Sequence, residues 1–206
     1  RIGAIVVRKE AKEETRGSVD KLFINTTGIG EIEYKGISAS HLKDGMSIFV
    51  SRDVGTHGAT IFAAREGIEL ESKLQTDCAS LYPEVKKLID SGIEIIALRD
   101  ATRGGVSAVL NEWAKSSDVC IEVVEESIPV QEEVRGICEM LGFEAVDLAN
   151  EGTYVLCVPK KDEAKALEVL QETHKTSTLI ATVSEQYKGR VLLNSSWGTK
   201  RFLDLP

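Results

Sequence analysis

The sequence lacks the patterns that mark membrane, nucleic-acid-binding and zinc proteins. No apolar run approaches the ~20 residues that an α-helix needs to cross a bilayer. The 33 acidic residues outnumber the 25 basic ones, which gives a formal net charge of −8, and no basic run interrupts this excess. A charge of this sign argues against a nucleic-acid partner. The three histidines are too scattered along the chain to predict a zinc site.

Cysteines are few, and the four present form no Cys-x-x-Cys pair and no Cys/His ligand spacing. Cys120 and Cys157 lie in strand-like runs, and Cys138 lies on the apolar face of a predicted helix, so we expect three buried thiols. Unpaired thiols of this kind are typical of the reducing cytoplasm. Cys78 follows Asp77 at a predicted helix start, the one setting among the four that suits a reactive thiol.

Internal repeats and low-complexity segments are also absent, and the composition is that of an ordinary folded protein. The 206 residues, 42% hydrophobic and 28% charged, suffice for one large domain or one and a half. Residues 2–7 and 21–25 are predicted strands, and a few strands without a covering helix are only marginally stable. We therefore expect residues 1–44 to be the trailing part of a sheet domain whose beginning is missing. Residues 45–206 are expected to form a separate α/β domain.

Hydrophobic periodicity predicts alternating helices and strands after residue 44. The predicted helices cover residues 57–66, 78–90, 104–115, 129–141 and 161–173. The predicted strands cover residues 47–51, 93–98, 119–124, 153–158, 178–184, 190–193 and 200–203. Pro129 is expected to start the fourth helix and Gly142 to end it. Interleaved helices and strands with an antiparallel meander at the end indicate an α+β or mixed α/β class.

The most informative segment is residues 98–105, Leu-Arg-Asp-Ala-Thr-Arg-Gly-Gly. An apolar run ends in Arg-Asp, a glycine turn follows, and a pattern with helical spacing begins. Two consecutive glycines let backbone N–H groups approach a ligand, and a helix N-terminus favours an anion. The alternative is an ordinary helix start in which Asp100 and Thr102 act as caps.

Four other motifs place small or polar residues at the ends of predicted elements. They are Asn25-Thr26-Thr27-Gly28-Ile29-Gly30, Gly55-Thr56-His57-Gly58-Ala59, Thr76-Asp77-Cys78-Ala79 and Ala149-Asn150-Glu151-Gly152. His57, at a helix start, is predicted either to cap that helix or to donate to a phosphate. Asn150 and Gly152 are common turn residues, so a plain β-turn is the alternative there. Glu151 is the unusual member, because it puts a carboxylate just before a buried run.

These motifs, in this order, resemble the HypE family of hydrogenase maturation factors. The most specific of the motifs that carry the resemblance are Arg99-Asp100-x-Thr102-Arg103-Gly104-Gly105, Leu110-Asn111-Glu112 and Ile128-Pro129-Val130. HypE proteins are carbamoyl dehydratases of the superfamily that includes aminoimidazole ribonucleotide synthetase and selenophosphate synthetase. The resemblance covers almost the whole chain and implies an α+β fold. Residues 45–206 would be the C-terminal α/β domain of the aminoimidazole ribonucleotide synthetase-like fold, after the last strands of an N-terminal nucleotide-binding sheet domain in residues 1–44.

The resemblance implies an ATP-dependent dehydration of a carboxamide held on a C-terminal cysteine. The product is a thiocyanate, which supplies the cyanide ligands of nickel–iron hydrogenase. ATP and Mg²⁺ are the implied cofactors, and most of their ligands would lie in an N-terminal half-domain that we expect to be missing here, together with a C-terminal Pro-Arg-Ile-Cys tail. The chain alone is therefore expected to be inactive. The carbamoyltransferase HypF and the HypC–HypD complex are the implied partners of a cytoplasmic homodimer.

The resemblance also implies roles for individual residues. Lys12 and Glu151 are the implied catalytic bases, and no residue is assigned as a metal ligand. The residues implied to bind nucleotide or substrate are Asn25, Thr26, Gly28, His57, Asp100, Thr102, Arg103, Gly104, Gly105 and Asn150. The sequence departs from the family pattern at two places. Thr153 occupies the position where HypE usually has Lys. The residues Lys9-Glu10-Ala11-Lys12 occupy the position of the family motif Gly-Asp-Thr-Lys, of which only the final Lys is kept. An ordinary surface lysine is the alternative for Lys12.

Two other functions compete with this enzyme. One is a non-catalytic docking module for other maturation factors. The other is a different ATP-using enzyme of the same superfamily, such as selenophosphate synthetase, although the equivalent turn of that enzyme lacks Thr-Arg-Gly-Gly.

Overall fold

The computed structural model describes residues 29–30, 32–67, 74–195 and 197–204. The chain divides into two compact units, residues 1–35 and residues 36–206, and every described helix and strand lies in the second. The strands expected at residues 2–7 and 21–25 lie outside the described residues.

Residues 36–44 group with the second unit. The Ser38 N–H donates to the Ile96 carbonyl at 3.0 Å, the Leu42 N–H donates to Ser117 Oγ at 3.0 Å, and the Leu42 side chain is buried. These contacts favour a boundary between the two units near residue 36. That residues 45–206 fold as a separate domain stays a prediction.

Seven strands form one mixed sheet in the order β2-β4-β1-β5-β3-β6-β7. The strands are β1 (Ser47–Val50), β2 (Ala97–Asp100), β3 (Cys120–Val124), β4 (Tyr154–Val158), β5 (Thr178–Ser184), β6 (Val191–Asn194) and β7 (Lys200–Phe202). Among the described strands only the β3–β6 pair is parallel. The predicted meander is wrong, because β3 lies between β5 and β6. The apolar β3, with Ile121 and Val123 buried, gains a partner on each side in this interior position.

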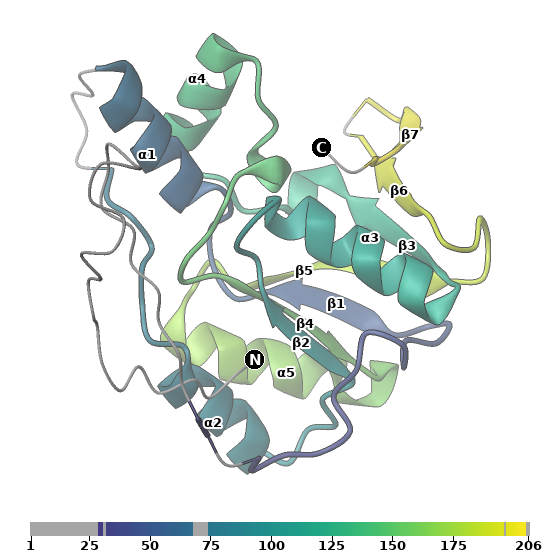
Figure 1. Cartoon of the computed structure of the whole chain (residues 1–206). Coiled ribbons are helices and arrows are strands. Elements are labelled where there is room, and N and C mark those ends of the chain that lie inside the picture. The colour runs from purple at the N-terminus through teal and green to yellow at the C-terminus, as the bar shows by residue number, and fades with distance from the viewer. Residues whose placement is uncertain (1–28, 31, 68–73, 196, 205–206) are drawn as a thin grey trace, which may run out of the picture. The chain divides into compact units, whose positions relative to one another are not determined.

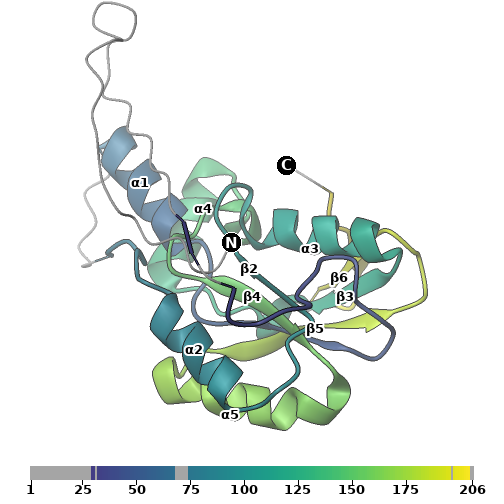
Figure 2. The same ribbon diagram turned by 60° about the horizontal axis from the view of Figure 1, so that its bottom comes forward.

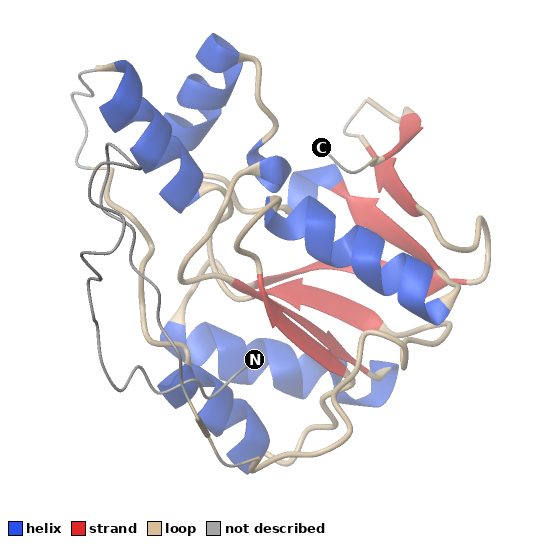
Figure 3. Ribbon diagram, in the orientation of Figure 1, coloured by secondary structure: helices blue, strands red, loops and turns tan. Residues whose placement is uncertain are grey.

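Helices cover both faces of this sheet. They are α1 (Thr56–Glu66), α2 (Tyr82–Asp90), α3 (Gly105–Ser117), α4 (Glu132–Leu141) and α5 (Glu163–Thr173), with 3₁₀ turns η2 (Glu125–Ser127), η3 (Ala145–Asp147) and η4 (Lys160–Asp162). Figures 1 and 2 show α3 on one face of the sheet and α2 with α5 on the other. α1 and α4 pack against each other through a small apolar cluster of their own. Helices and strands alternate along most of the chain, and the sheet is antiparallel except for the β3–β6 pair, which agrees with the expected α+β or mixed α/β class. Figure 3 shows these helices and strands by colour.

The interior strands β1 and β4 are buried along their whole length because helices cover both faces of the sheet there. β1 reads Ser-Ile-Phe-Val and β4 reads Tyr-Val-Leu-Cys-Val, and every residue of both is buried. From α3, Leu110 and Trp113 are buried in the core cluster that includes Ile121. Burying one side chain of this size stabilises the fold by about 1.5–3 kcal/mol.

The helix expected from residue 78 begins only at Tyr82, with Pro83 in its first turn. The Asp77 side chain, which could have capped a helix starting at residue 78, is occupied elsewhere. The Asp77 carboxylate accepts hydrogen bonds from the turn before β4, so residues 76–81 run as an irregular segment.

Two other boundaries differ from the prediction. Pro129 does not start a helix, since its carbonyl accepts the Val54 N–H at 2.8 Å and α4 begins later, at Glu132. The strand expected over residues 93–98 forms a ladder only from Ala97 to Asp100, where β4 is its partner.

The three thiols expected to be buried are buried, and Cys78 is exposed. Burial raises the pKa of Cys157 to about 12 and also raises the pKa values of Cys120 and Cys138, so these thiols are unreactive near neutral pH. No helix within the described ranges is both long and apolar enough to cross a membrane.

Candidate active site

Three connecting segments meet at one end of the sheet. β1 and β2 both run antiparallel to β4, which lies between them, so both end where β4 begins. The Ser51 N–H donates to the Tyr154 carbonyl and the Ala101 N–H donates to the Thr153 carbonyl, each at 3.0 Å. The segments that follow β1 and β2 are thereby brought to the segment that precedes β4.

Asn150 joins the three segments. Its side chain is fully buried, and Oδ1 accepts the Gly55 N–H at 2.8 Å. Nδ2 donates to the carbonyls of Ala101 and Leu148, both at 3.0 Å. Both amide protons of Asn150 are therefore used inside the protein. Asn150 therefore holds the three segments together by hydrogen bonds and has no amide proton left to donate to a ligand.

The glycine turn after β2 has the geometry that its sequence predicts. Gly104 and Gly105 have φ values of 73° and 59°, a region that favours glycine. A Cβ on Gly105 would lie 2.3 Å from the Val146 carbonyl oxygen, so η3 packs directly on this turn. No side chain of the described residues caps α3, which excludes the alternative of Asp100 and Thr102 as caps. The first N–H groups of a helix without a capping side chain favour an anion.

The turn after β1 begins α1 and carries His57. Gly55 occupies the N-cap position of α1, and no described side chain bonds the first N–H groups, so His57 does not cap the helix. His57 Nδ1 instead lies 2.7 Å from Thr76 Oγ1, and Cys78 Sγ lies 3.8 Å from the same nitrogen.

A cavity of about 510 Å³ opens between the beginnings of α1 and α3 and the segment around η3. Its charged or titratable lining residues are His57, Arg65, Arg103, Glu144 and Asp147. The rest of its wall is mostly glycine and apolar side chains. A cavity with a few convergent polar groups is the usual form of a small-molecule site.

Among the carboxylates that line this cavity, Asp147 has a pKa that is raised above its ordinary value. Burial raises its pKa, while a hydrogen bond from Ser107 and the charge of Arg201 act in the opposite direction. Its Oδ1 is buried without a hydrogen bond to any other described residue. Nothing in the sequence singles out Asp147, because its burial depends on packing between η3 and α3.

Glu151 lies in the turn before β4, two residues after Ala149, which lines the cavity; Glu151 itself is not among the lining residues. Its side chain is exposed and makes no hydrogen bond or ion pair with another described residue. Its backbone is held by Asp77, whose Oδ1 accepts the Glu151 N–H at 3.0 Å. Asp77 carried no assigned role in the sequence, and residues so far apart in the chain give no local signal of this contact.

The other residues assigned from the motifs divide into two groups. Asp100 is exposed at the end of β2, the Thr102 carbonyl accepts the Gly105 N–H at 3.0 Å, and Arg103 is exposed in the glycine turn beside the cavity. The residues that lie outside the described ranges are Lys12, Asn25, Thr26 and Gly28. The described part of the chain holds no group of three or more potential metal-ligating side chains.

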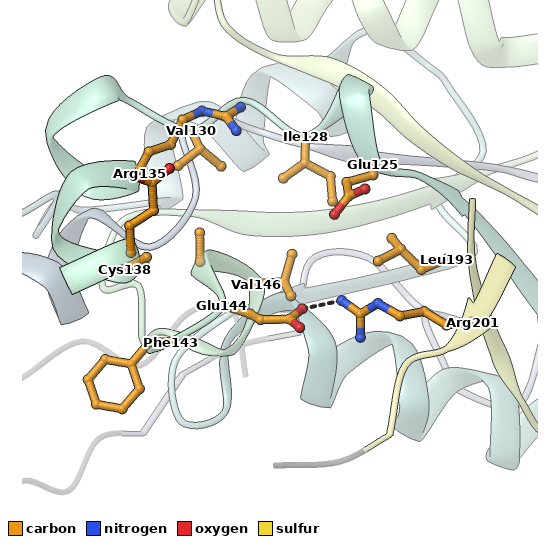
Figure 4. A pocket seen from close by; sticks show the side chains of 12 residues that line it. Glu125, Ile128, Val130, Arg135, Cys138, Phe143, Glu144, Val146, Leu193 and Arg201 are labelled. Carbon is orange, nitrogen blue, oxygen red and sulfur yellow. Dashed lines mark hydrogen bonds and ion pairs between the residues drawn. The ribbon is translucent and has the colours of Figure 1, made fainter. Parts of the chain in front are cut away.

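A second cavity, of about 360 Å³, lies between α4, η3 and the β6–β7 hairpin. Figure 4 shows the apolar side chains of Ile128, Val146 and Leu193 along it, with Glu144 and Arg201 paired at one side. This ion pair joins β7 to the segment before η3 and is half exposed, so its contribution to stability is small.

A mixed seven-stranded sheet with helices on both faces and three connecting segments converging at one end defines a domain of the aminoimidazole ribonucleotide (AIR) synthase type. The family model described as "AIR synthase related protein, C-terminal domain" matches residues 43–194, and the chain belongs to this family. Over 208 residues the chain is 43% identical to carbamoyl dehydratase HypE of Escherichia coli strain K12, covering 99% of this chain and 61% of that protein. The resemblance to HypE predicted from the motifs is thereby confirmed.

Solved structures show the same relationship. A hydrogenase maturation protein HypE in complex with ATP is 36% identical, with a TM-score of 0.88, and the match covers 93% of this chain and 60% of that one. HypE in a HypE–HypF complex is 39% identical, with a TM-score of 0.85 and coverage of 92% and 63%. The chain thus spans less than two thirds of the length of these relatives.

Proposed function

We propose that this chain is the part of an ATP-dependent carbamoyl dehydratase that contributes its Glu151 carboxylate to the reacting centre. The observation that carries the proposal is the placement of this exposed carboxylate. It lies in the same cluster of turns as the uncapped beginning of α3. The similarity to HypE over nearly the whole chain supports the same activity.

The reaction converts a cysteine S-carboxamide and ATP into a thiocyanate, ADP and phosphate. ATP would supply a phosphoryl group to the amide oxygen, which then departs as phosphate. The nitrogen must lose its two protons as the triple bond forms, so a base within hydrogen-bond reach is required. Glu151 is that base in our proposal, and Lys12, outside the described residues, is the second candidate.

The described residues fit the anionic part of such a substrate. The uncapped α3 N-terminus and the Gly104–Gly105 turn offer backbone N–H groups, and Arg103 and His57 add donors along the cavity. They hold no group of three or more potential metal ligands. Mg²⁺ that accompanies ATP is usually bound by one or two carboxylates together with the phosphates, and we propose that most of its ligands lie outside the described part of the chain.

The proposed partners follow from the same relatives. A solved HypE–HypF complex supports HypF, the carbamoyltransferase, as the protein that delivers the carboxamide. The HypC–HypD complex as the acceptor of the cyano group, and a homodimer as the assembly, are further parts of the proposal.

The test uses the full-length protein that contains this chain, with the carboxamide loaded on its C-terminal cysteine. Mass spectrometry of the C-terminal peptide should show the loss of one water only when ATP is added. ATP consumption with no loss of water would contradict the proposal and favour another ATP-using enzyme of the superfamily. A protein that binds HypF but neither consumes ATP nor changes the peptide would favour a docking module.

A further inference from the structure

We infer that Asp77 is the positioning residue for Glu151, because its carboxylate fixes the backbone of the turn that carries the catalytic carboxylate. The inference rests on the function proposed above and assigns a role to a residue that the motifs left unexplained.

One carboxylate binds three consecutive residues of that turn. Asp77 Oδ1 accepts the Glu151 N–H at 3.0 Å, and Oδ2 accepts the Gly152 N–H at 3.0 Å. Oδ2 also lies 3.0 Å from Thr153 Oγ1. Hydrogen bonds to an ionised acceptor are roughly twice as strong as neutral ones. Asp77 therefore restrains the backbone on both sides of the Glu151 Cα.

The backbone of Asp77 also packs against the turn. A Cβ on Gly152 would lie 1.8 Å from the Asp77 carbonyl oxygen, so only glycine permits this approach. The Thr153 hydroxyl is buried and lies 3.0 Å from the Asp53 carbonyl oxygen as well. The turn is thus tied both to the segment before α2 and to the segment after β1.

These contacts separate the roles of the two carboxylates. Asp77 is half-buried, and both of its oxygens are occupied by groups of the turn. Glu151 is exposed, and its carboxylate makes no bond with another described residue. Only Glu151 is available to contact a substrate, and Asp77 acts through it.

Asp77→Asn is the sharpest variant, since it keeps the size of the side chain. An amide has one acceptor oxygen, and its NH₂ group would face a backbone N–H or the Thr153 hydroxyl, so the turn loses part of its restraint. We expect kcat to fall by about 10–100-fold, the cost of misplacing a reacting group by about 1 Å. The KM for ATP should not change, and hydrogen exchange at the amides of residues 151 and 152 should become faster.

The matched control is Asp90→Asn, at the end of α2. This exposed carboxylate bonds Lys86 Nζ at 2.9 Å and lies outside the site. Its kcat and the exchange at residues 151 and 152 should match those of the unmodified protein.

The decisive experiment is a double-mutant cycle in the full-length protein. If Asp77 acts only through Glu151, then Asp77→Asn should change the rate of a Glu151→Gln protein by less than about threefold. Additive losses, or an Asp77→Asn protein with unchanged kcat, would overturn the positioning role alone. A Glu151→Gln protein with an unchanged rate would overturn the proposed function on which this inference rests.

Discussion

At the residue scale, Gly105 shows how closely the segments of the site pack. Its φ is positive, and a Cβ added at this position would lie 2.3 Å from the Val146 oxygen, so there is no room for a side chain. From the two consecutive glycines, the sequence predicted that backbone N–H groups approach a ligand, and that stays a prediction. The packing of η3 against Gly105 was not predicted, because η3 comes from a distant part of the chain.

Gly105→Ala should therefore lower the free energy of unfolding by about 2–4 kcal/mol, from backbone strain and overpacking together. Gly136→Ala is the control, since Gly136 lies within α4 and a Cβ added there would meet no described atom within 4 Å. That substitution should stabilise the protein by about 0.5–1 kcal/mol. Urea denaturation measures both values, and equal effects of the two substitutions would contradict this account of the turn.

A second residue-scale prediction concerns pH. Burial raises the folded-state pKa of Asp147 above the ordinary value of 3.8, so the folded state disfavours the ionised form. Stability should fall as the pH rises from about 4 through the raised pKa, because the unfolded state loses its proton first. Asp147→Asn removes this ionisation and should be more stable than the unmodified protein at pH 7. The difference should vanish below pH ~4, and a difference that persists there would contradict the assignment.

At the element scale, Asn150 connects β1, β2 and β4 at the ends where the site forms. The sequence predicted turns after β1, after β2 and before β4, because each motif lies at the end of an apolar run. The role of Asn150 was not predictable. Asparagine is a common turn residue, and only the strand order shows that its amide reaches three different carbonyl and N–H groups.

Asn150→Ala would leave the Gly55 N–H and the Leu148 carbonyl without their buried side-chain partner, and the Ala101 carbonyl would keep only the backbone N–H of residue 150. We expect a loss of about 2–4 kcal/mol in the free energy of unfolding. The comparison is Asn194→Ala, since Asn194 Nδ2 makes a single bond among the described residues, to the Val123 carbonyl at 3.2 Å. Its loss should be about 1 kcal/mol. An Asn150→Ala protein no less stable than Asn194→Ala would contradict the role of Asn150 in holding the three segments together.

The element boundaries show where periodicity is insufficient. Buried strands and amphipathic helices were predicted because their apolar residues recur at fixed spacing. The late start of α2 and the position of β3 were not, because both depend on contacts with distant segments: Asp77 with the turn before β4, and β3 with β5 and β6. Periodicity therefore identifies the class of the fold but not the order of its strands.

At the scale of the whole molecule, the described helices and strands belong to one compact unit that begins near residue 36, and we expect this unit to unfold cooperatively. A chain of residues 36–206 should unfold in a single transition. Residues 45–206 should also fold, but with about 1.5–3 kcal/mol less stability, because they lack the buried Leu42 side chain. Thermal or urea unfolding of the two chains measures the difference. Equal stabilities would show that residues 36–44 contribute nothing to the unit.

The most direct test of the central claim is the rate of dehydration in a full-length protein with Glu151→Gln. Glutamine keeps the size and hydrogen-bonding capacity of the side chain and removes the base. We predict a fall of about 10²–10⁴-fold, the usual contribution of general acid–base catalysis, with ATP binding and thermal stability little changed. A rate within a few fold of the unmodified protein, or a loss of stability with no specific defect in rate, would contradict the claim and leave Glu151 as a residue of the turn alone.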